Sequence, residues 1–442
     1  MDLRLIHYVH SAMASTSKNI VIIGGGIIGC TTAYYLSRHA SFSSSTTIKV
    51  IEASIHGVAQ GASGKAGGLV ARWAYPSGLV NVSFPEHVKL ANEHNGKERW
   101  GFRFVQAGSW EGSGALPNGK GRKRDEMSLE KTLGLEEGIR RSAAGDSRTR
   151  RSIGLPEDLL WVEEHLTDGY SSMAPEGHTA QVHPYLFTTS MMELAREKGA
   201  ELVQGRVISI LRENGEVTGV VCAKHNSKDK ETIPATDIIL TAGAWSPSLV
   251  PSLPVEGLRA HSITIHTDPS VTISPYVLFT SIQLPTGIVT PEIYARPGHE
   301  LYACSGADDC PLPETVDDVQ VDLSACEALH ETVGSISSEL RNGKVDKRQA
   351  CFLPVVPSGG GPIVGAASKV AEGLYIAAGH TCWGICNAPG TGKVLAELVM
   401  EGKLPRASVS SGGVKRGELS FHAHAATTCA IHLPCSEILL NT

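Results

Sequence analysis

The sequence predicts an α/β fold, with a Rossmann-like dinucleotide-binding domain and a discontinuous second, mainly antiparallel β (α+β) domain. The first observation is a short apolar run at 20–23, a glycine-rich turn, helix-compatible spacing at 28–36 and a second apolar run at 48–51. Strand, helix and returning strand within about 30 residues form a βαβ unit with parallel strands. The second observation is the alternating β pattern that dominates 255–347, which favours an antiparallel sheet inserted between pieces of the parallel one.

Length and composition agree with a large soluble enzyme or binding protein. At about 100 to 200 residues per domain, 442 residues predict two domains. The net charge of -6 lacks the basic excess of a nucleic-acid binder, so nucleic acid is excluded as a partner. No apolar run approaches the roughly 18 residues of a membrane span. The ten cysteines have no framework spacing, which favours reduced thiols and a cytoplasmic location.

The remaining elements follow from periodicity and turn residues. Proline-initiated helix spacing occupies 184–198, strand patterns occupy 202–211, 217–222, 238–241 and 374–378, with a turn at 214–215, and a helix is expected over 387–400. The parallel pattern therefore returns near the end of the chain.

The chemistry-bearing motif is Gly24-x-Gly26-x-x-Gly29, directly after the first strand and at the start of the first helix. Gly24 permits the tight turn, Gly26 leaves room for a pyrophosphate, and Gly29 lets helix and sheet pack closely. Glu52 ends the second strand, where a carboxylate can accept hydrogen bonds from both ribose hydroxyls. It would repel a 2′-phosphate, so NADP is disfavoured.

Three further blocks resemble one known family. Q-G-A-S-G-K-A-G-G at 60–68, T-D-I-I-L-T-A-G-A-W-S-P at 236–247 and G-L-Y-I-A-A-G-H-T-C-W-G-I-C-N-A-P-G-T-G-K at 373–393 resemble the D-amino-acid oxidase superfamily of FAD-dependent oxidoreductases, most of all a fungal glycine-oxidase-like and sarcosine-oxidase-like branch. The motif and the resemblance together imply FAD, held by Gly24, Gly26, Ile28, Gly29, Glu52, Ala62, Ser63, Gly64, Lys65, Val207, Ala242, Gly243, Cys351, Gly379, Gly384 and Ile385. Gly384, near a helix N-terminus, could aim backbone N–H groups at the flavin edge where reduction develops negative charge.

The resemblance also implies a reaction. The family oxidises amines by moving a hydride from the carbon beside nitrogen to flavin N5, so we expect a small amine or amino-acid substrate with oxygen as acceptor. Arg296 matches a strand region that faces the flavin, where its guanidinium could bind a substrate carboxylate; a surface salt bridge is the alternative. Tyr302, Trp245, His380 and Trp383 are candidate pocket walls or ordinary packing residues. His380 could act as an acid or base near neutral pH.

Two rival functions remain open at the level of sequence. The same scaffold serves dehydrogenases that oxidise a 2-hydroxy acid or an amine and pass electrons to a carrier. A flavin-retaining adaptor in membrane trafficking is the rival from another class, with the basic insert 119–151 as a protein-binding surface. That insert holds ten Lys/Arg and six Asp/Glu, and it reads as solvated or mobile.

The attachment of FAD is a separate question. Cys351 lies six residues before Pro357, a spacing that resembles the segment through which sarcosine-oxidase-like relatives form a cysteinyl thioether. A nearby cation such as Lys347 or Arg348 would have to lower the pKa of the thiol. An ordinary buried cysteine with noncovalent FAD is the alternative.

Domain boundaries follow from these assignments. The expected segments are a flexible N-terminus at 1–17, an FAD-binding domain at 18–90, 180–252 and 350–405, a substrate domain at 91–179 and 253–349, and an irregular tail at 406–442. Histidines and cysteines in the tail offer zinc-type ligands, but no C-x-x-C pair anchors them, so no metal site is expected.

Overall fold

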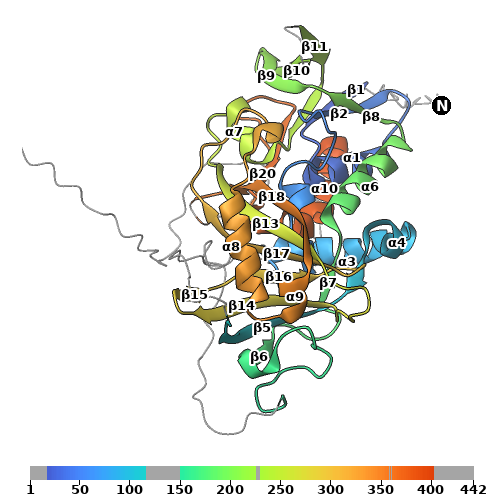
Figure 1. The fold of residues 1–442 in the computed structure, drawn as a ribbon. Helices are drawn as coiled ribbons and strands as arrows, with labels where there is room; N and C mark the ends of the chain where they lie inside the picture. Colours follow the sequence, from blue (N-terminus) through green and yellow to red (C-terminus); the bar gives the residue numbers. More distant parts are fainter. Residues whose placement is uncertain (1–16, 116–149, 225–228, 358, 360, 403–442) are drawn as a thin grey trace, which may run out of the picture.

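The computed structural model describes residues 17–115, 150–224, 229–357, 359 and 361–402. Residues 1–16 of the expected N-terminal segment 1–17, nearly all of the basic insert and the tail beyond 402 lie outside the described residues. Figure 1 shows a sheet near the N-terminal strand at one end of the molecule and a second, larger sheet at the other end.

The first sheet has six strands, in the order β19-β20-β12-β1-β2-β8. Its strands are β1 (Lys18–Ile23), β2 (Thr46–Glu52), β8 (Ala200–Gln204), β12 (Asp237–Leu240), β19 (Ile363–Ala366) and β20 (Leu374–Ala378). All neighbours run parallel except β19 and β20, which are antiparallel. The sequence prediction of a parallel βαβ unit is confirmed.

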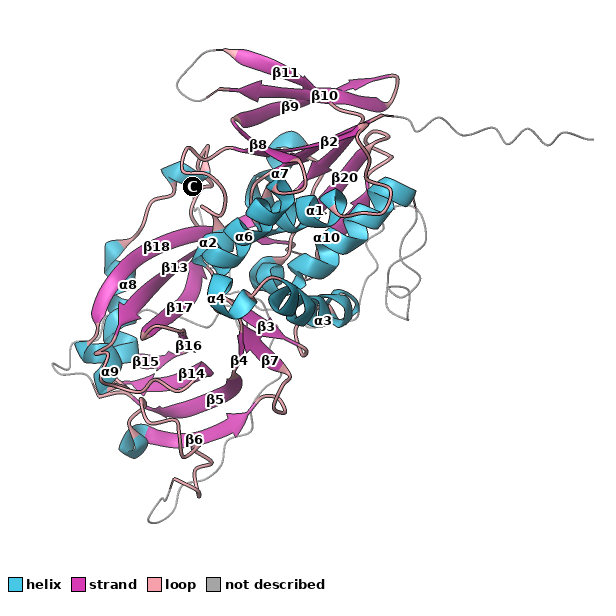
Figure 2. Cartoon of the chain, turned by 90° about the vertical axis from the view of Figure 1, so that its right-hand side faces the viewer, coloured by secondary structure: helices cyan, strands magenta, loops and turns pink. Residues whose placement is uncertain are grey.

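Both faces of this sheet are covered, and this explains why β1 is apolar without alternation. Ile20 and Ile22 pack into a core with α1 (Ile27–Ser37), α6 (Pro184–Arg196) and α10 (Gly384–Glu401). Val21 and Ile23 pack on the other face, against the three-stranded sheet of β9 (Arg206–Glu213), β10 (Glu216–Ala223) and β11 (Lys230–Pro234). In Figure 2 the helices lie on one side of the sheet and the small sheet lies beyond it.

The second large sheet has the order β18-β13-β17-β16-β14-β5-β6, with β15 beside β14. Its strands are β5 (Gln106–Ser113), β6 (Thr167–Ser172), β13 (Glu256–His266), β14 (Tyr276–Leu284), β15 (Gly287–Val289), β16 (Glu292–Ala295), β17 (Glu300–Asp308) and β18 (Lys344–Val355). Every pair is antiparallel except β5 with β14. The mainly antiparallel second sheet was therefore predicted correctly.

Three sequence expectations are corrected. The strand expected over 202–211 is two strands, because the chain leaves the parallel sheet at Gly205 and enters the three-stranded one. The β-rich stretch 255–347 also contains the helices α8 (Leu323–Gly334) and α9 (Ser338–Asn342). The last helix begins at Gly384 rather than at residue 387.

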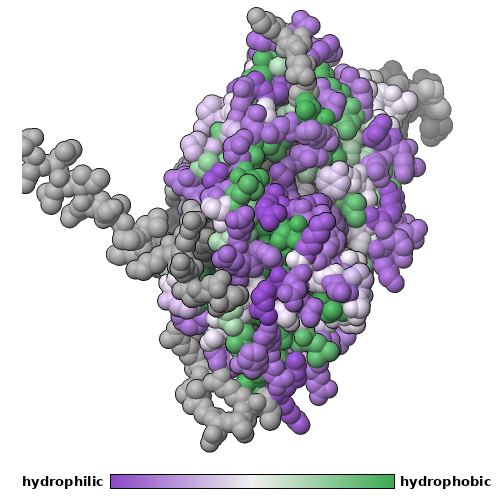
Figure 3. Space-filling model, in the orientation of Figure 1, coloured by the Kyte–Doolittle hydropathy of each residue, from purple (hydrophilic) through white to green (hydrophobic). Residues whose placement is uncertain are grey.

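The other elements lie between these strands in the sequence, and three of them form a small sheet of their own. They are α2 (Ala62–Lys65), β3 (Leu69–Ala71), α3 (Ser77–Glu93), α4 (Gly96–Trp100), β4 (Arg103–Phe104), η1 (Glu164–Leu166), β7 (Thr179–Gln181), η2 (Gly243–Trp245), α7 (Ser246–Leu249), η3 (Val316–Asp318) and η4 (Thr381–Trp383). Among the described residues, no helix combines the length and apolar character needed to cross a bilayer. The face seen in Figure 3 is mostly hydrophilic, with small separate apolar groups.

Candidate active site

A groove of about 210 Å³ lies at the carboxyl ends of the parallel strands. Gly24 follows β1, Glu52 ends β2, Ala242 follows β12 and His380 follows β20, and all four line it. This is the edge of a doubly wound sheet where dinucleotides bind. The predicted cofactor residues that line the groove are Gly24, Gly26, Ile28, Glu52, Ala62, Ser63, Val207, Ala242, Gly243, Gly384 and Ile385.

Glu52 is held rigidly at the groove. Its Oε2 accepts a hydrogen bond from the backbone N–H of Gly25 and its Oε1 accepts one from Ser54, both at 2.7 Å. Burial raises the pKa of Glu52, and the two N–H donors partly oppose that shift. Each carboxylate oxygen keeps a second lone pair, so the side chain can still accept ribose hydroxyls.

Three predicted cofactor glycines shape the groove without lining it. A Cβ on Gly29 would overlap the carbonyl oxygen of Gly24, and one on Gly64 would overlap that of Ala59. Gly379 has φ +76°, and its turn delivers His380 to the groove. The prediction that Gly29 allows close packing is confirmed, while direct lining by these three glycines is not.

Sequence reasoning missed the segment 313–317, which we call the strap. It lies in the connection between β17 and α8, and Val316 lines the groove. Trp245 Nε1 donates to the carbonyl of Pro313 at 2.8 Å, Ser54 Oγ donates to Asp317 at 2.6 Å, and Arg206 pairs with Glu314 at 2.6 Å. No local pattern in the strap signals these contacts, which depend on tertiary structure.

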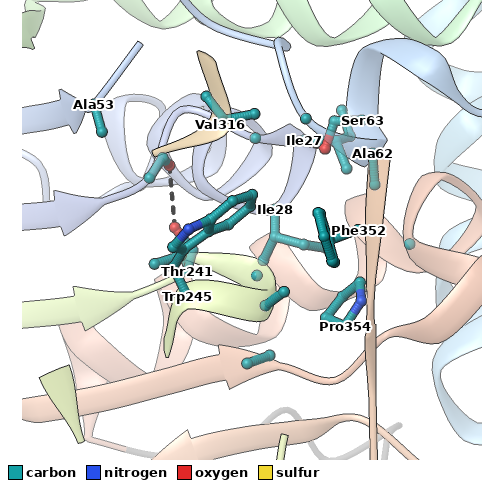
Figure 4. Close-up of a pocket in the computed structure, with 18 of the residues that line it drawn as sticks. Ile27, Ile28, Ala53, Ala62, Ser63, Thr241, Trp245, Val316, Phe352 and Pro354 are labelled. Carbon is teal, nitrogen blue, oxygen red and sulfur yellow. Dashed lines mark hydrogen bonds between the residues drawn. The ribbon is translucent and has the colours of Figure 1, made fainter. Parts of the chain in front are cut away.

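Trp245 lies on the cofactor side, so its assignment as a wall of the substrate pocket is corrected. Figure 4 shows its indole near Ile28 and Phe352 in the groove. The rings of Trp245 and Phe352 make an edge contact with centroids 6.2 Å apart. Its N–H is used by the strap, and Trp245 does not line the second cavity described next.

A second cavity of about 50 Å³ adjoins the groove. The two share wall residues, namely Ala62, Ala66, Leu353, Cys382 and Ile385. Tyr294 of β16, Tyr302 of β17 and Trp383 of η4 form aromatic walls of the second cavity. A small ligand there would lie beside a ligand in the groove, which is the arrangement a two-reactant site needs.

Two predicted wall residues, Tyr302 and Trp383, are thus in the second cavity. Tyr302 makes an edge contact with Tyr294, with centroids 5.5 Å apart, and burial raises its pKa well above the usual value, so its hydroxyl stays protonated. Trp383 packs edge-on against Trp73, and its Nε1 has no hydrogen-bond partner among the described residues.

Arg296 is placed differently from the sequence expectation. It is 5% exposed, and it lines neither cavity. Its Nη1 pairs with Glu300 Oε1 at 2.8 Å, and its Nη2 donates to the Ala66 carbonyl at 2.6 Å. The guanidinium lies 4.7 Å from the ring centroid of Tyr302. Arg296 therefore supports the wall of the cavity from behind, and its role as a carboxylate clamp is corrected, as is the surface alternative.

The surroundings of His380 favour an uncharged ring. It is buried at the groove, and its Nε2 lies 3.1 Å from Thr391 Oγ1. Burial lowers the pKa of His380 to about 3, so the ring is neutral at pH 7. The acid–base role of His380 stays a prediction, and this low pKa disfavours it.

Cys351 and Lys65 line the second cavity rather than the groove. Lys65 Nζ donates to the carbonyl of Ala350 at 3.0 Å. Burial raises the pKa of Cys351 to about 11, and the charge of Lys65 acts in the opposite direction. The cation that acts on this thiol is Lys65, which corrects the expectation of Lys347 or Arg348.

Comparison with known proteins agrees with this site. Residues 19–398 match the family described as "FAD dependent oxidoreductase" (DAO). TDA3 of Saccharomyces cerevisiae is 33% identical over 89% of this chain and 94% of its own length, and C1F5.03c of Schizosaccharomyces pombe is 33% identical over 89% and 97%. Glycine oxidase from Bacillus cereus shares the fold, with a TM-score of 0.62 at 17% identity over 87% of this chain and 96% of its own. The chain belongs to the DAO family of FAD-dependent oxidoreductases, and its cofactor is FAD.

Proposed function

We propose that the chain oxidises a small amine or amino acid, with oxygen as the electron acceptor. The observation that carries this proposal is the second cavity, which shares wall residues with the groove and takes half of its lining from strands of the other large sheet. A substrate there lies against one end of a cofactor in the groove. FAD, when bound, supplies the hydride acceptor.

The residues of the groove fit FAD along its length. We assign the ribose to Glu52, the pyrophosphate to Gly26 and the N-terminus of α1, and the adenine side to Val207. At the other end α10 begins with Gly384 and Ile385, and its N-terminal N–H groups favour negative charge there. The space beside Gly26 is open on the groove side, since a Cβ there would meet only Ser63 Oγ, at 3.1 Å.

The size of the second cavity supports a small substrate. Its volume of about 50 Å³ has room for roughly three to five water-sized groups. The structural neighbours include proteins titled glycine oxidase, iminodiacetate oxidase and L-proline dehydrogenase. The substrates in these titles are small amines or amino acids. The titles include both oxidases and a dehydrogenase.

We expect a panel of small amines and amino acids to bleach the FAD absorbance without air, and air to restore it quickly. Hydride transfer reduces the flavin, and an oxidase returns the electrons to oxygen. Anaerobic titration and stopped-flow mixing with air-saturated buffer measure the two halves. Reoxidation no faster than that of free reduced flavin would contradict the oxidase and favour a dehydrogenase. Bleaching only by 2-hydroxy acids would reject amine oxidation.

We also propose that FAD is held noncovalently. A thioether requires a thiolate, and the pKa of about 11 keeps Cys351 protonated at neutral pH. Acid precipitation of the holoprotein should therefore leave the yellow colour in the supernatant. A yellow pellet that becomes colourless in Cys351→Ser would contradict this and establish the covalent bond.

The cellular setting is part of the same proposal. None of the eight described cysteines is in a disulfide bond, which supports a reducing, cytoplasmic compartment. A protein partner that binds the basic insert 119–151 stays a prediction, because almost all of that insert lies outside the described residues.

A further inference from the structure

Among the described residues, four acidic side chains are buried, and one of them differs from the rest. Glu52 accepts two backbone N–H groups, Glu86 pairs with Lys393 at 2.6 Å, and Asp237 pairs with Lys18 at 3.2 Å. The fourth, Glu292, is 2% exposed and lines the second cavity. Its Oε1 has no hydrogen-bond partner in the described part of the chain.

The surroundings of Glu292 satisfy only one side of the carboxylate. Tyr294 Oη donates to Oε2 at 2.6 Å, and Cys304 Sγ lies 3.9 Å from the same oxygen. Lys65, in the same cavity, donates to the Ala350 carbonyl. His261, also in the cavity, accepts the backbone N–H of Asp322 at its Nε2. An isolated buried carboxylate is costly, so a positively charged ligand is its natural partner.

We propose that the second cavity binds its substrate as an organic ammonium ion, with Glu292 Oε1 as the counter-ion; this rests on the amine oxidation proposed above. The position of Glu292 on β16, between β14 and β17, fixes the carboxylate in the middle of the sheet. Arg296, which would have favoured an anionic substrate, pairs with Glu300 outside the cavity. At Glu292 Oε1 the site therefore favours the positive charge of an ammonium ion over the negative charge of a 2-hydroxy acid.

The test compares a cation with an uncharged molecule of the same shape. Tetramethylammonium and tert-butanol are titrated into the FAD-loaded protein, and binding is followed by the change in flavin absorbance. Tetramethylammonium cannot be oxidised, because its nitrogen has no lone pair. We expect the wild-type protein to bind the cation roughly 30-fold or more tightly than the alcohol, and Glu292→Gln to remove that preference. Glu111→Gln, on β5 of the same sheet and outside both cavities, is the matched control and should keep it.

The outcomes separate this inference from the proposed function. Equal binding of cation and alcohol by the wild-type protein overturns the inference, even if Glu292→Gln loses its FAD. Cation binding that survives in a folded, yellow Glu292→Gln also overturns it. If amines bleach the flavin equally in wild type and Glu292→Gln, amine oxidation stands and the role of Glu292 fails. If the cation binds through Glu292 but no amine bleaches the flavin, the cation site stands and amine oxidation fails.

Discussion

We expect Gly26→Val to yield a folded protein that has lost its FAD. The new side chain would enter the groove beside the N-terminus of α1, in the space that we assign to the pyrophosphate. The fold should survive, because the Cβ meets only Ser63 Oγ, at 3.1 Å, and the backbone at Gly26 has an extended φ of -75° that any residue adopts. The flavin absorbance per protein in the purified variant should fall by about tenfold or more, equivalent to about 1.4 kcal/mol of binding free energy or more.

Gly78→Val is the matched control. Gly78 lies in α3, and a Cβ there would have no heavy atom within 4 Å. Its FAD content should equal that of the wild-type protein. A yellow Gly26→Val protein with full flavin content would show that the pyrophosphate lies elsewhere.

We expect Arg296→Ala to have its main effect on stability rather than on substrate affinity. The variant leaves Glu300 without its cation, and breaking a buried pair costs about 3 to 5 kcal/mol of unfolding free energy. Burial alone would raise the pKa of Glu300, but the charge and hydrogen bond of Arg296 hold it below the usual value. The attraction between Arg296 and the Glu300 carboxylate is therefore fully present above the usual pKa of a glutamate. It is lost at lower pH, as Glu300 becomes protonated. The stability difference, measured by denaturant unfolding, should shrink between pH 7 and pH 4.

Arg259→Ala tests whether burial is the reason for the large stability cost expected for Arg296→Ala. Arg259 makes a two-point pair with Asp308 on neighbouring strands of the same sheet, with both distances 2.9 Å. That pair is more exposed, so its loss should cost about 1 kcal/mol or less. If Arg296→Ala kept wild-type stability and raised KM about tenfold, Arg296 would return to the substrate site.

The cofactor groove could be predicted because its signals are local. Gly24, Gly26 and Glu52 lie within one βαβ unit, where the strand, the turn and the helix start fix their positions relative to one another. The helix α8 also had a readable signal, since Cys326, Leu329 and Val333 recur on one helical face after the N-cap Asp322. The surrounding β patterns concealed it.

The substrate side could not be predicted in the same way. Whether Arg296 meets a ligand or Glu300 depends on the hairpin between β16 and β17, which returns the acid to the arginine. The open side of Glu292 depends on which groups of neighbouring strands and loops fail to reach it. Sequence spacing carries no information about a missing hydrogen-bond partner, because a buried strand residue has the same spacing whether or not its side chain is paired.

The strap has a thermodynamic consequence. Its contacts with Ser54, Arg206 and Trp245 bring a connection of the antiparallel sheet to the end of the groove to which we assign the adenosine, and most of the groove is formed by the parallel sheet. A ligand that binds only when both sheets are in place adds its binding free energy to their association, by RT ln(1 + [L]/Kd). We therefore expect the melting temperature of the protein to rise with FAD concentration.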